Sequence, residues 1–500
     1  MSRLSFSPQC VLCPSYELTK PLDANKSFLL KECLTYVKGE VVYPESTNYL
    51  SSIANCNCRL ILHPIAIVYV LDVEDVQESI NCANQLDIPV VPKSGGHSYE
   101  GYSLGGRDGV LVIDVSKLNQ VTVDLESQTA VVGSGNRLGP VYAKLNESGF
   151  VIPAGSCPQV GVGGQATGGG YGFLGRKYGM LSDNVIAAEI VIANGSFLSV
   201  NSTQHPDLFF ALRGAGNAGY GVVTSFTMKV YPAPETVTVF NFTYATSDAQ
   251  KVFDTFSTVG PTLNKNFSLY LSLFSDLIYE GNECDKNDET DKLTIHGSNF
   301  GPLDETKSLL EEFINLNPIK EPVFIEAGWW DTVIDFVGDG NETAVLHPYF
   351  YPEPFKQKSF FVDSPGLTTE GLTFLQNYIN SSKCKTVVLT ELYAGGRVNE
   401  ISTDESAFFH RDSLYVIQLE TKLKGVSQDL WEECVNAVNK FGTEFQGNYT
   451  SYHSYQLYID KDLSDWGTRY YGYHFTKLIE IKATYDPLNR FNWAQSIPIE

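Results

Sequence analysis

Two residues that could form covalent bonds or transfer protons stand alone in glycine-rich stretches. His97 lies in PVVPKSGGHSY (residues 89–99), directly after an apolar run and a glycine pair. Cys157 lies in AGSCPQVGVGGQATGGGYG (residues 154–172), directly before a proline. By its type alone, His97 is compatible with a ligand, a general base or an ordinary loop histidine. Cys157 is equally compatible with a disulfide, a buried thiol or a reactive thiol.

Glycines are frequent between Gly161 and Gly175. Glycine destabilises the interior of a helix or strand, and this many glycines would be costly there. We therefore expect this stretch to pack closely against backbone or a flat ligand. A third glycine-rich turn, RGAGNAGYGVV (residues 213–223), leads into a strand. The chain has no Walker-type phosphate loop, and its glycines do not follow a strand in a Rossmann unit. Three such turns in one domain predict an extended dinucleotide site.

The elements that must position these turns alternate along the first half of the chain. An amphipathic pattern over residues 73–87 predicts a helix. Runs rich in β-branched residues predict strands at residues 60–72, 88–94, 109–118, 120–135, 184–200 and 222–230. We expect this mixed domain to end at the proline-bearing segment near residues 231–236.

The region that follows is rich in aromatic residues and predicts one large sheet. The expected strands are residues 267–279, 292–301, 385–396 and 413–423. Helical patterns at residues 305–316 and 367–382 lie between them, so one face of the sheet is left for a ligand. The tail, residues 470–498, predicts an amphipathic helix, an Asp-Pro turn and an extended end.

The composition narrows the classes of partner. The chain has 500 residues, 43% of them hydrophobic, and a formal net charge of −23. An acidic surface repels nucleic acid and anionic lipid, so we expect neither as a partner. No apolar run reaches membrane-spanning length, and the first residues lack a secretory signal pattern. We expect a monomer that acts on a small molecule.

Cysteines and sequons favour an extracellular protein. Six of the ten cysteines precede residue 85, and a Cys-x-x-Cys pair at Cys10 and Cys13 lacks the second pair that a zinc site needs. We therefore expect disulfides and secretion. Asn-x-Ser/Thr sequons, which predict glycosylation, occur at Asn25, Asn146, Asn194, Asn201, Asn241, Asn266, Asn341, Asn380 and Asn448.

Four segments together resemble the berberine-bridge-enzyme-like flavoproteins of the vanillyl-alcohol-oxidase fold: residues 89–102, 155–172, 213–223 and the terminal YDPLNRFNWAQSIP. The resemblance runs in order from about residue 60 to the end. It implies an α+β fold with a two-part FAD-binding domain of the PCMH type and a substrate domain with a large antiparallel sheet covered by helices. We expect the boundaries at residues 1–232, 233–464 and 465–500.

The resemblance implies FAD bound at two points, through a histidine to its 8α-methyl group and through a cysteine to C6. His97 and Cys157 stand at those positions. Val160 stands where the family's valine admits oxygen, and Gln165 stands where the family usually has histidine. No metal is expected. The other expected FAD-binding residues are Ser94, Gly95, Gly96, Ser98, Gly161, Gly163, Gly164, Gly168 and Val222.

The segment SYQLYIDKDL resembles the family's Tyr-x-Asn-Tyr-x-Asp motif and places Tyr458 at the catalytic tyrosine. Leu457 replaces the usual asparagine, which removes a hydrogen-bonding group. Because tyrosine titrates near pH 10, a tyrosine base needs a coupled proton acceptor. Glu391 is the candidate acceptor, with an ordinary surface glutamate as the equal alternative.

The resemblance to the carbohydrate-oxidising branch implies that four residues position a sugar: Tyr99, Ser156, Gln418 and Tyr455. It also implies a Cys33–Cys82 disulfide. The expected reaction oxidises the anomeric C1 hydroxyl of an oligosaccharide to a lactone and reduces O2 to H2O2. The alternatives are oxidation of an allylic or aromatic alcohol or secondary metabolite, and a flavin-loaded binding protein without turnover.

Overall fold

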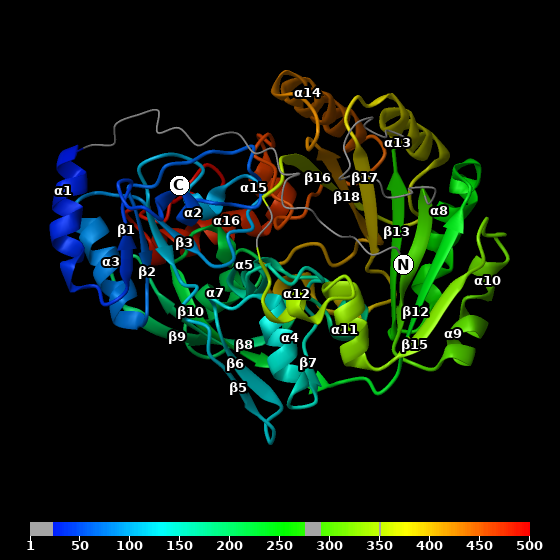
Figure 1. The fold of residues 1–500 in the computed structure, drawn as a ribbon, viewed down its shortest axis with the longest axis horizontal. Coiled ribbons are helices and arrows are strands. Elements are labelled where there is room, and N and C mark those ends of the chain that lie inside the picture. The colour runs from blue at the N-terminus through cyan, green and yellow to red at the C-terminus, as the bar shows by residue number, and fades with distance from the viewer. Residues whose placement is uncertain (1–23, 276–291, 350–351) are drawn as a thin grey trace.

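The computed structural model describes residues 24–275, 292–349 and 352–500. Its strands form two groups that lie side by side, with helices between them (Figure 1). A four-stranded sheet, a five-stranded sheet and a two-stranded pair are formed before residue 233, and a seven-stranded sheet is formed after it. The helices between the groups are α4 (Leu138–Asn146), α11 (Trp329–Val337) and α12 (Glu342–Leu346).

The first sheet has four strands in the order β1-β2-β4-β3. Its three neighbours β2, β4 and β3 are parallel, and α3 connects β2 to β3 as a crossover. The Asp72 carboxylate caps α3 by accepting a hydrogen bond from the Asp75 N–H at 3.0 Å. The elements are β1 (Glu40–Val42), β2 (Ala66–Tyr69), α3 (Val73–Gln85), β3 (Val90–Lys93) and β4 (Leu111–Asp114).

The helix predicted at residues 73–87 is confirmed as α3, but the strand predicted at residues 60–72 is much shorter. Pairing begins only at Ala66 because Pro64 has no N–H to donate to a neighbouring strand. The preceding residue His63 instead donates its N–H to the Asp108 carboxylate at 2.8 Å.

The second sheet is antiparallel, in the order β5-β6-β10-β8-β9. A small pair, β7 with β11, lies beside it. The strand predicted at residues 222–230 is confirmed as β10, whereas the segments predicted at 120–135 and 184–200 each form two antiparallel strands. The bounds are β5 (Val121–Asp124), β6 (Thr129–Gly133), β7 (Phe150–Val151), β8 (Val185–Val191), β9 (Phe197–Asn201), β10 (Val222–Lys229) and β11 (Tyr231–Pro232).

The seven-stranded sheet is antiparallel throughout, in the order β15-β12-β14-β13-β17-β18-β16. The four predicted strands are its central members, although residues 276–279 of one lie outside the described residues. Three strands were not predicted: β12, β15 and β16. The bounds are β12 (Val237–Tyr244), β13 (Phe267–Phe274), β14 (Leu293–Asn299), β15 (Val323–Ala327), β16 (Phe355–Val362), β17 (Thr386–Leu392) and β18 (Tyr415–Lys422).

Helices cover one face of this sheet and share an apolar core with it. The opposite face looks toward the N-terminal sheets (Figure 1). The predicted helix at residues 305–316 is split in two, and the one at residues 367–382 is confirmed. The helices on this side are α8 (Ala249–Thr258), α9 (Leu303–Leu309), α10 (Glu311–Ile314), α13 (Thr369–Ser381) and α14 (Gln428–Phe445).

The tail forms the predicted helix and returns to the N-terminal half. Phe491 and Trp493 pack in the core of the four-stranded sheet. The Lys482 ammonium contacts the Asp486 carboxylate and donates to the carbonyl of Gly219 in the third glycine-rich turn. The expected domain boundaries stay predictions. The remaining helices are α1 (Ala24–Cys33), α2 (Tyr49–Ser52), α5 (Val162–Gly168), α6 (Gly175–Tyr178), α7 (Pro206–Leu212), α15 (Trp466–Tyr471) and α16 (His474–Tyr485).

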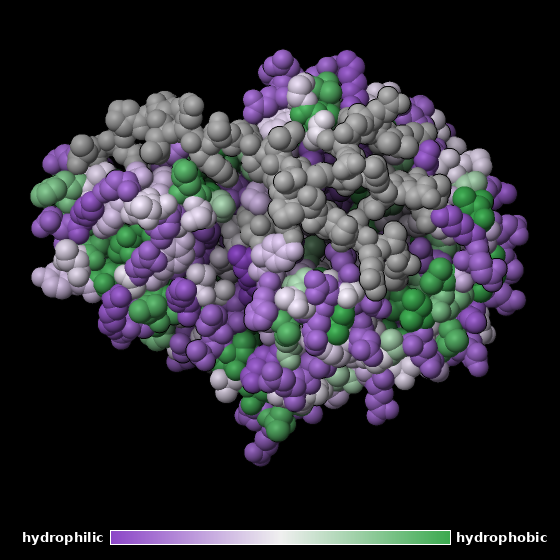
Figure 2. Space-filling model, viewed as in Figure 1, coloured by the Kyte–Doolittle hydropathy of each residue, from purple (hydrophilic) through white to green (hydrophobic). Residues whose placement is uncertain are grey.

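Two disulfides between described residues join elements distant in sequence. Cys33 and Cys82 link α1 to α3, which confirms that prediction, and Cys384 is bonded to Cys434 on α14. The Cys-x-x-Cys pair before residue 24 lies outside the described residues. Within the described ranges, no helix is both long and apolar enough to span a bilayer. The face in Figure 2 is mostly hydrophilic, with small, separated apolar patches.

Candidate active site

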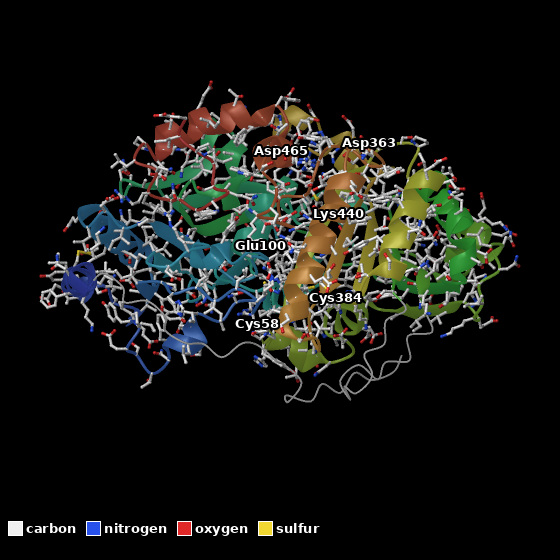
Figure 3. The ribbon with its side chains drawn as sticks, turned by 90° about the horizontal axis from the view of Figure 1, so that it is seen from above. Cys58, Glu100, Asp363, Cys384, Lys440 and Asp465 are labelled. Atoms are coloured by element: carbon white, nitrogen blue, oxygen red, sulfur yellow. A yellow bond between two sulfur atoms is a disulfide. The ribbon has the colours of Figure 1, made fainter. Side chains whose placement is uncertain are left out.

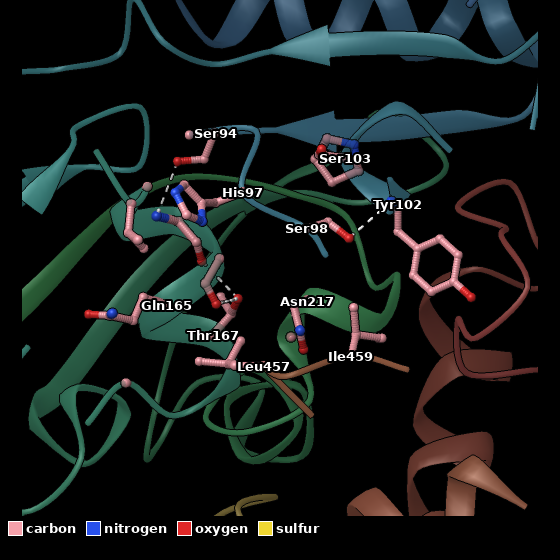
Figure 4. A pocket seen from close by; sticks show the side chains of 18 of the residues that line it. Ser94, His97, Ser98, Tyr102, Ser103, Gln165, Thr167, Asn217, Leu457 and Ile459 are labelled. Atoms are coloured by element: carbon pink, nitrogen blue, oxygen red, sulfur yellow. Dashed lines mark hydrogen bonds between the residues drawn. The ribbon is translucent and has the colours of Figure 1, made fainter. Parts of the chain in front are cut away.

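A cavity of about 250 Å³ opens between the glycine-rich turns of the first half and the segment around residues 455–459. Most of the residues expected to bind FAD line it. Figure 4 shows several of these side chains pointing into one space. The predicted residues among the lining are Ser94, Gly95, Gly96, His97, Ser98, Tyr99, Val160, Gly161, Gly163, Gly164, Tyr455 and Tyr458.

Two glycine-rich turns cross here backbone against backbone. A Cβ atom on Gly95 would lie 2.3 Å from the Gly161 nitrogen, and one on Gly161 would lie 2.2 Å from the Gly95 nitrogen. Neither position can therefore hold a side chain. The Ser94 hydroxyl fixes the crossing, because it donates to the Ser134 carbonyl at 2.7 Å and accepts from the Gly163 N–H at 3.3 Å.

The glycine-rich stretch after Gly161 was not expected to form a helix. Val162–Gly168 forms the short helix α5 although it contains three glycines. Packing outweighs their poor helix propensity, because a Cβ on Gly163 would lie 2.9 Å from the Ser134 carbonyl oxygen. Gly164 also lines the cavity, and a Cβ there would meet no described atom within 4 Å.

The two candidate attachment residues differ in exposure. His97 lines the cavity, and desolvation lowers its pKa to about 4, which keeps the imidazole neutral. Cys157 is a free, exposed thiol three residues before Val160. Burial raises the pKa of Tyr99, and the charge of Cys157 adds to that shift. Cys157 and Ser156 are not among the lining residues.

Four residues from three separate segments leave polar atoms without a partner in the described chain. The buried Asn217 Oδ1, Tyr102 and Ser103 hydroxyls and Gln456 Oε1 have none, and all four residues line the cavity. Buried polar groups normally have partners. Glycine backbone on one side and unused hydrogen-bonding groups on the other fit a flat, polar dinucleotide cofactor.

Tyr458 and Glu391 form a hydrogen-bonded pair beside the cavity. The Tyr458 hydroxyl donates to Glu391 Oε1 at 2.7 Å, and the buried Glu391 Oε2 has no partner in the described residues. Burial raises the pKa of Glu391 to about 7, although the hydrogen bond from Tyr458 opposes the shift. A carboxyl group with that pKa can accept a proton from Tyr458 near neutrality.

Strand pairing explains how Glu391 reaches this place. Glu391 on β17 is paired with Val416 on β18, and Gln418 lies two residues further along β18. Paired residues and residues two apart share a face, so Glu391 and Gln418 both point away from the helix-covered face. The Gln418 amide donates to the Gln357 side chain at 2.7 Å and lies 3.5 Å from the Tyr99 hydroxyl.

Tyr455 and Tyr458 lie on a turn, because the Tyr458 N–H donates back to the Tyr455 carbonyl at 2.9 Å. The Tyr455 hydroxyl accepts from the Gly170 N–H at 2.9 Å, so it holds a glycine turn. The Tyr458 ring stacks on Tyr99 with 5.9 Å between centroids and 14° between planes.

Two departures from the family pattern have local explanations. Leu457 packs against Gly168, where a Cβ would come within 2.3 Å of the leucine side chain. The neighbouring Gln456 supplies an amide instead, donating to the Gly168 and Gly214 carbonyls at 2.7 and 2.9 Å. Gln165 is buried and accepts from the Gly155 N–H at 2.9 Å.

Sequence reasoning missed several lining residues, and Gly168 and Val222, like Cys157, were expected to bind FAD but do not line the cavity. Val222 is buried in the apolar core, and its neighbour Val223 lines the cavity. Asn217 stood inside the third glycine-rich turn, where a lone amide among glycines was an available signal. Other lining residues carried no local signal: Tyr102, Ser103, Thr167, Tyr171, Gln456, Ile459 and Trp493.

Two families match the chain. The FAD binding domain family matches residues 64–201, and the family described as berberine and berberine like matches residues 454–498. The first range holds two of the crossing turns, and the second holds Tyr458. The fold and the cavity thus define an FAD-linked oxidoreductase of the oxidase type.

Comparison with whole proteins gives the family. Berberine bridge enzyme-like 21 from Arabidopsis thaliana is 32% identical over 454 residues, which cover 85% of this chain and 81% of that protein. The structure of BBE-like 1 from Physcomitrella patens is 32% identical, with a TM-score of 0.86 over 94% of this chain and 99% of that one. The chain belongs to the berberine-bridge-enzyme-like family.

A carbohydrate-oxidising enzyme is also similar in structure. A chitooligosaccharide oxidase is 25% identical, with a TM-score of 0.84 over 94% of this chain and 99% of that one. The chain therefore shares its fold with a protein named for an oligosaccharide substrate.

Proposed function

We propose that the protein is a carbohydrate oxidase that converts the anomeric C1 hydroxyl of an oligosaccharide to a lactone, with O2 becoming H2O2. The observation that carries the proposal is the 2.7 Å hydrogen bond from Tyr458 to Glu391, whose pKa is raised to about 7 by burial. This pair offers a proton path out of the cavity. The similarity to a chitooligosaccharide oxidase supports a sugar as the substrate.

Each of these side chains has one task in the proposed reaction. The substrate loses a proton from its hydroxyl and a hydride from its carbon. The Tyr458 oxygen takes the hydroxyl proton while Glu391 takes the proton of Tyr458. FAD, when bound, supplies the hydride acceptor. The Gln418 amide nitrogen lies 3.5 Å from the Tyr99 hydroxyl. Gln418 holds the sugar by polar contact, and Tyr99 holds it by ring stacking.

The test is oxygen uptake with a substrate panel. Cello-, chito- and xylo-oligosaccharides are compared with allylic and aromatic alcohols under the same conditions. Uptake that depends on a reducing oligosaccharide supports the proposal. Uptake with the alcohols alone contradicts the sugar substrate, and no uptake with any of them indicates a flavin-loaded binding protein.

The second candidate function is oxidation of an allylic or aromatic alcohol or a secondary metabolite. Relatives named for such substrates favour it, because a tetrahydroberberine oxidase from Berberis wilsoniae is 30% identical and a monolignol oxidoreductase from Arabidopsis thaliana 29%, against 25% for the chitooligosaccharide oxidase. The apolar Leu457 in the cavity lining is compatible with such a substrate. The panel above separates the two candidates directly.

We also propose that FAD is attached covalently through His97 and Cys157. A neutral imidazole in the cavity lining and a free exposed thiol support the proposal. Flavin should remain with the protein after acid precipitation, and each single variant, His97→Ala or Cys157→Ala, should retain one attachment. The double variant should release all flavin. Cys56→Ala is the matched control, since Cys56 is a buried free thiol. Complete release from the unmodified protein contradicts both attachments.

Oxygen access is proposed to depend on Val160, which lines the cavity. Leucine adds one methylene and should narrow the approach. Val160→Leu should therefore slow reoxidation of the reduced flavin by O2 and leave anaerobic reduction by substrate unchanged. Equal reoxidation rates would show that O2 arrives by another route.

We propose that the protein is secreted and glycosylated. The two disulfides between described residues support secretion. Glycosylation is supported by exposed sequons at Asn194, Asn341, Asn380 and Asn448. Protein from a eukaryotic culture medium should lose mass on treatment with an N-glycosidase. An unchanged mass would contradict glycosylation, and absence from the medium would contradict secretion.

A further inference from the structure

A buried cluster of charged side chains lies behind the two stacked tyrosines. Lys356 on β16 is fully buried, and its ammonium lies 2.5 Å from Glu100 Oε1 and 2.6 Å from Asp460 Oδ1. Figure 3 shows Glu100 at the junction between the N-terminal half and the helix α14. Neither Lys356 nor its two carboxylate partners is part of the cavity lining.

Three further charges complete this cluster. The Lys356 ammonium also lies 2.8 Å from Asp462 Oδ2, and Lys358 lies 2.5 Å from Asp460 Oδ2. Arg59 lies 3.1 Å from Glu100 Oε2. Three carboxylates therefore face three cations, which makes the cluster neutral as a whole. The three carboxylates are close enough together to ligate a metal ion, but a lysine ammonium already contacts all of them.

The cluster joins the segments that carry the tyrosines. Glu100 directly follows Tyr99, and Asp460 comes two residues after Tyr458. Phe355, the neighbour of Lys356, contacts the Tyr99 ring edge-on at 5.3 Å. The Lys356 Nζ atom thus links β16 to both tyrosine-bearing segments. It contacts each segment only one or two residues from the tyrosine.

We propose that Lys356 is a positioning residue, which sets the separation of Tyr99 and Tyr458 and thereby aims the Tyr458 hydroxyl at Glu391. The inference rests on the proposed role of Tyr458 as the base. Lys356 acts through Glu100 and Asp460, because it touches neither tyrosine in the cavity lining.

Electrostatics make this connection rigid. Burial opposes the charge on Asp460, but Lys358 and Lys356 outweigh it and lower the pKa of Asp460 below its usual value. Removing one partner of a buried ion pair leaves an uncompensated charge that must move toward water or take up a proton. Either response shifts the segment that holds Tyr458.

The experiment compares Lys356→Met, which removes the ammonium, with Lys356→Arg, which keeps the positive charge. Anaerobic stopped-flow measures flavin reduction by cellobiose across pH. We expect Lys356→Met to lower the limiting reduction rate about 10- to 100-fold, as a misplacement of about 1 Å does. Reoxidation by O2 should stay at the unmodified rate, and Lys356→Arg should recover most of the loss.

A matched control separates positioning from stability. Leu375→Ala removes a fully buried side chain from the core under the helices of the seven-stranded sheet, far from the tyrosines. It should lower the melting temperature without changing the reduction rate. If Lys356→Met fails to fold, the charge-compensated pair Lys356→Met with Asp460→Asn takes its place. An unchanged reduction rate in folded Lys356→Met, or in the folded pair, overturns the proposal when Tyr458→Phe lowers that rate.

Two further measurements keep this inference distinct from the proposed function. If Tyr458→Phe also leaves reduction unchanged, the base assignment has failed rather than the role of Lys356. A crystal structure of Lys356→Met needs no substrate: we expect the Tyr99–Tyr458 stacking at 5.9 Å and the hydrogen bond to Glu391 to be disturbed. Unchanged ring geometry overturns the positioning role even if cellobiose reduces neither protein.

Discussion

The two walls of the cavity are built in different ways. One wall is backbone: the turn at Gly95 crosses the turn at Gly161 with no room for a side chain. The opposite wall consists of side chains, where Tyr458 donates to Glu391 and stacks on Tyr99. The backbone wall can hold a cofactor closely but cannot tolerate substitution. The side-chain wall can move protons, and its substitutions should give graded losses of rate.

The largest effect should come from the backbone wall. Gly95→Ala places a Cβ 2.3 Å from the Gly161 nitrogen, so the crossing must open and bound flavin should be lost. Gly328→Ala is the control, because a Cβ there meets only the Asp331 carboxylate at 3.7 Å. The absorbance ratio of flavin to protein after purification measures the loading. Normal loading of Gly95→Ala would show that the crossing does not hold the flavin.

Gly164→Ala separates an effect on cofactor binding from an effect on protein packing. Its Cβ would meet no described atom, yet Gly164 lines the cavity. The variant should keep the melting temperature of the flavin-free protein and lose flavin occupancy. If both remain unchanged, the flavin does not approach this part of the wall.

Tyr458→Phe should give the next largest loss. Phenylalanine keeps nearly the same volume, so folding and flavin loading should survive. Loss of a general base typically lowers the rate about 10²- to 10⁴-fold. The loss should appear in anaerobic reduction and not in reoxidation by O2. A raised KM with an unchanged limiting reduction rate would assign Tyr458 to binding, and Tyr455 would become the next candidate base.

Glu391→Gln should change the pH profile. Because burial raises the pKa of Glu391 to about 7, the carboxyl is protonated below that pH and cannot accept a proton. The reduction rate should therefore rise through pH 7 and level off above it, and the glutamine variant should be slow without this rise. The raised pKa also affects folding stability. Protonated Glu391 stabilises the folded protein fully below about pH 4.3, the pKa of glutamate in an unfolded chain, and this stabilisation is lost as the pH rises toward 7. An identical profile in Glu391→Gln contradicts the acceptor role.

The smallest effect should come from Gln418→Leu, which has nearly the same size and removes the contacts to Gln357 and Tyr99. One neutral hydrogen bond to substrate contributes about 0.5–1.5 kcal/mol, which corresponds to a rise in KM of roughly 2- to 13-fold. Steady-state kinetics with the best oligosaccharide gives the value. A fall in the limiting rate without a change in KM would place Gln418 in the chemical step instead.

The same contrast explains how much could be predicted from sequence. Glycine-rich turns are local signals, so most of the backbone wall was predicted, although the glycines of α5 were wrongly expected to lie outside a helix. The side-chain wall depends on pairing between distant strands. Glu391 could not be told from a surface glutamate until β17 was seen beside β18.

Other residues escaped prediction because their signals are not periodic. Every residue of β16 is buried, including Lys356, so the strand lacks the alternation of apolar and polar residues that marks a half-exposed strand. Gln456 was overlooked because the resemblance directed attention to Leu457, whereas the amide that donates to the Gly168 carbonyl belongs to the preceding residue. Such compensations follow from three-dimensional neighbours and not from the local sequence.

The central claim, oxidation at an anomeric hydroxyl by the Tyr458–Glu391 pair, is tested most directly by a pair of sugars. The reducing oligosaccharide with the highest oxygen uptake is compared with its methyl glycoside in anaerobic flavin reduction. Methylation removes the one hydroxyl proton that Tyr458 would take and leaves the other sugar contacts in place. We predict rapid reduction by the free sugar and none by the glycoside. Equal reduction by both, or reduction by aromatic alcohols alone, would contradict the account.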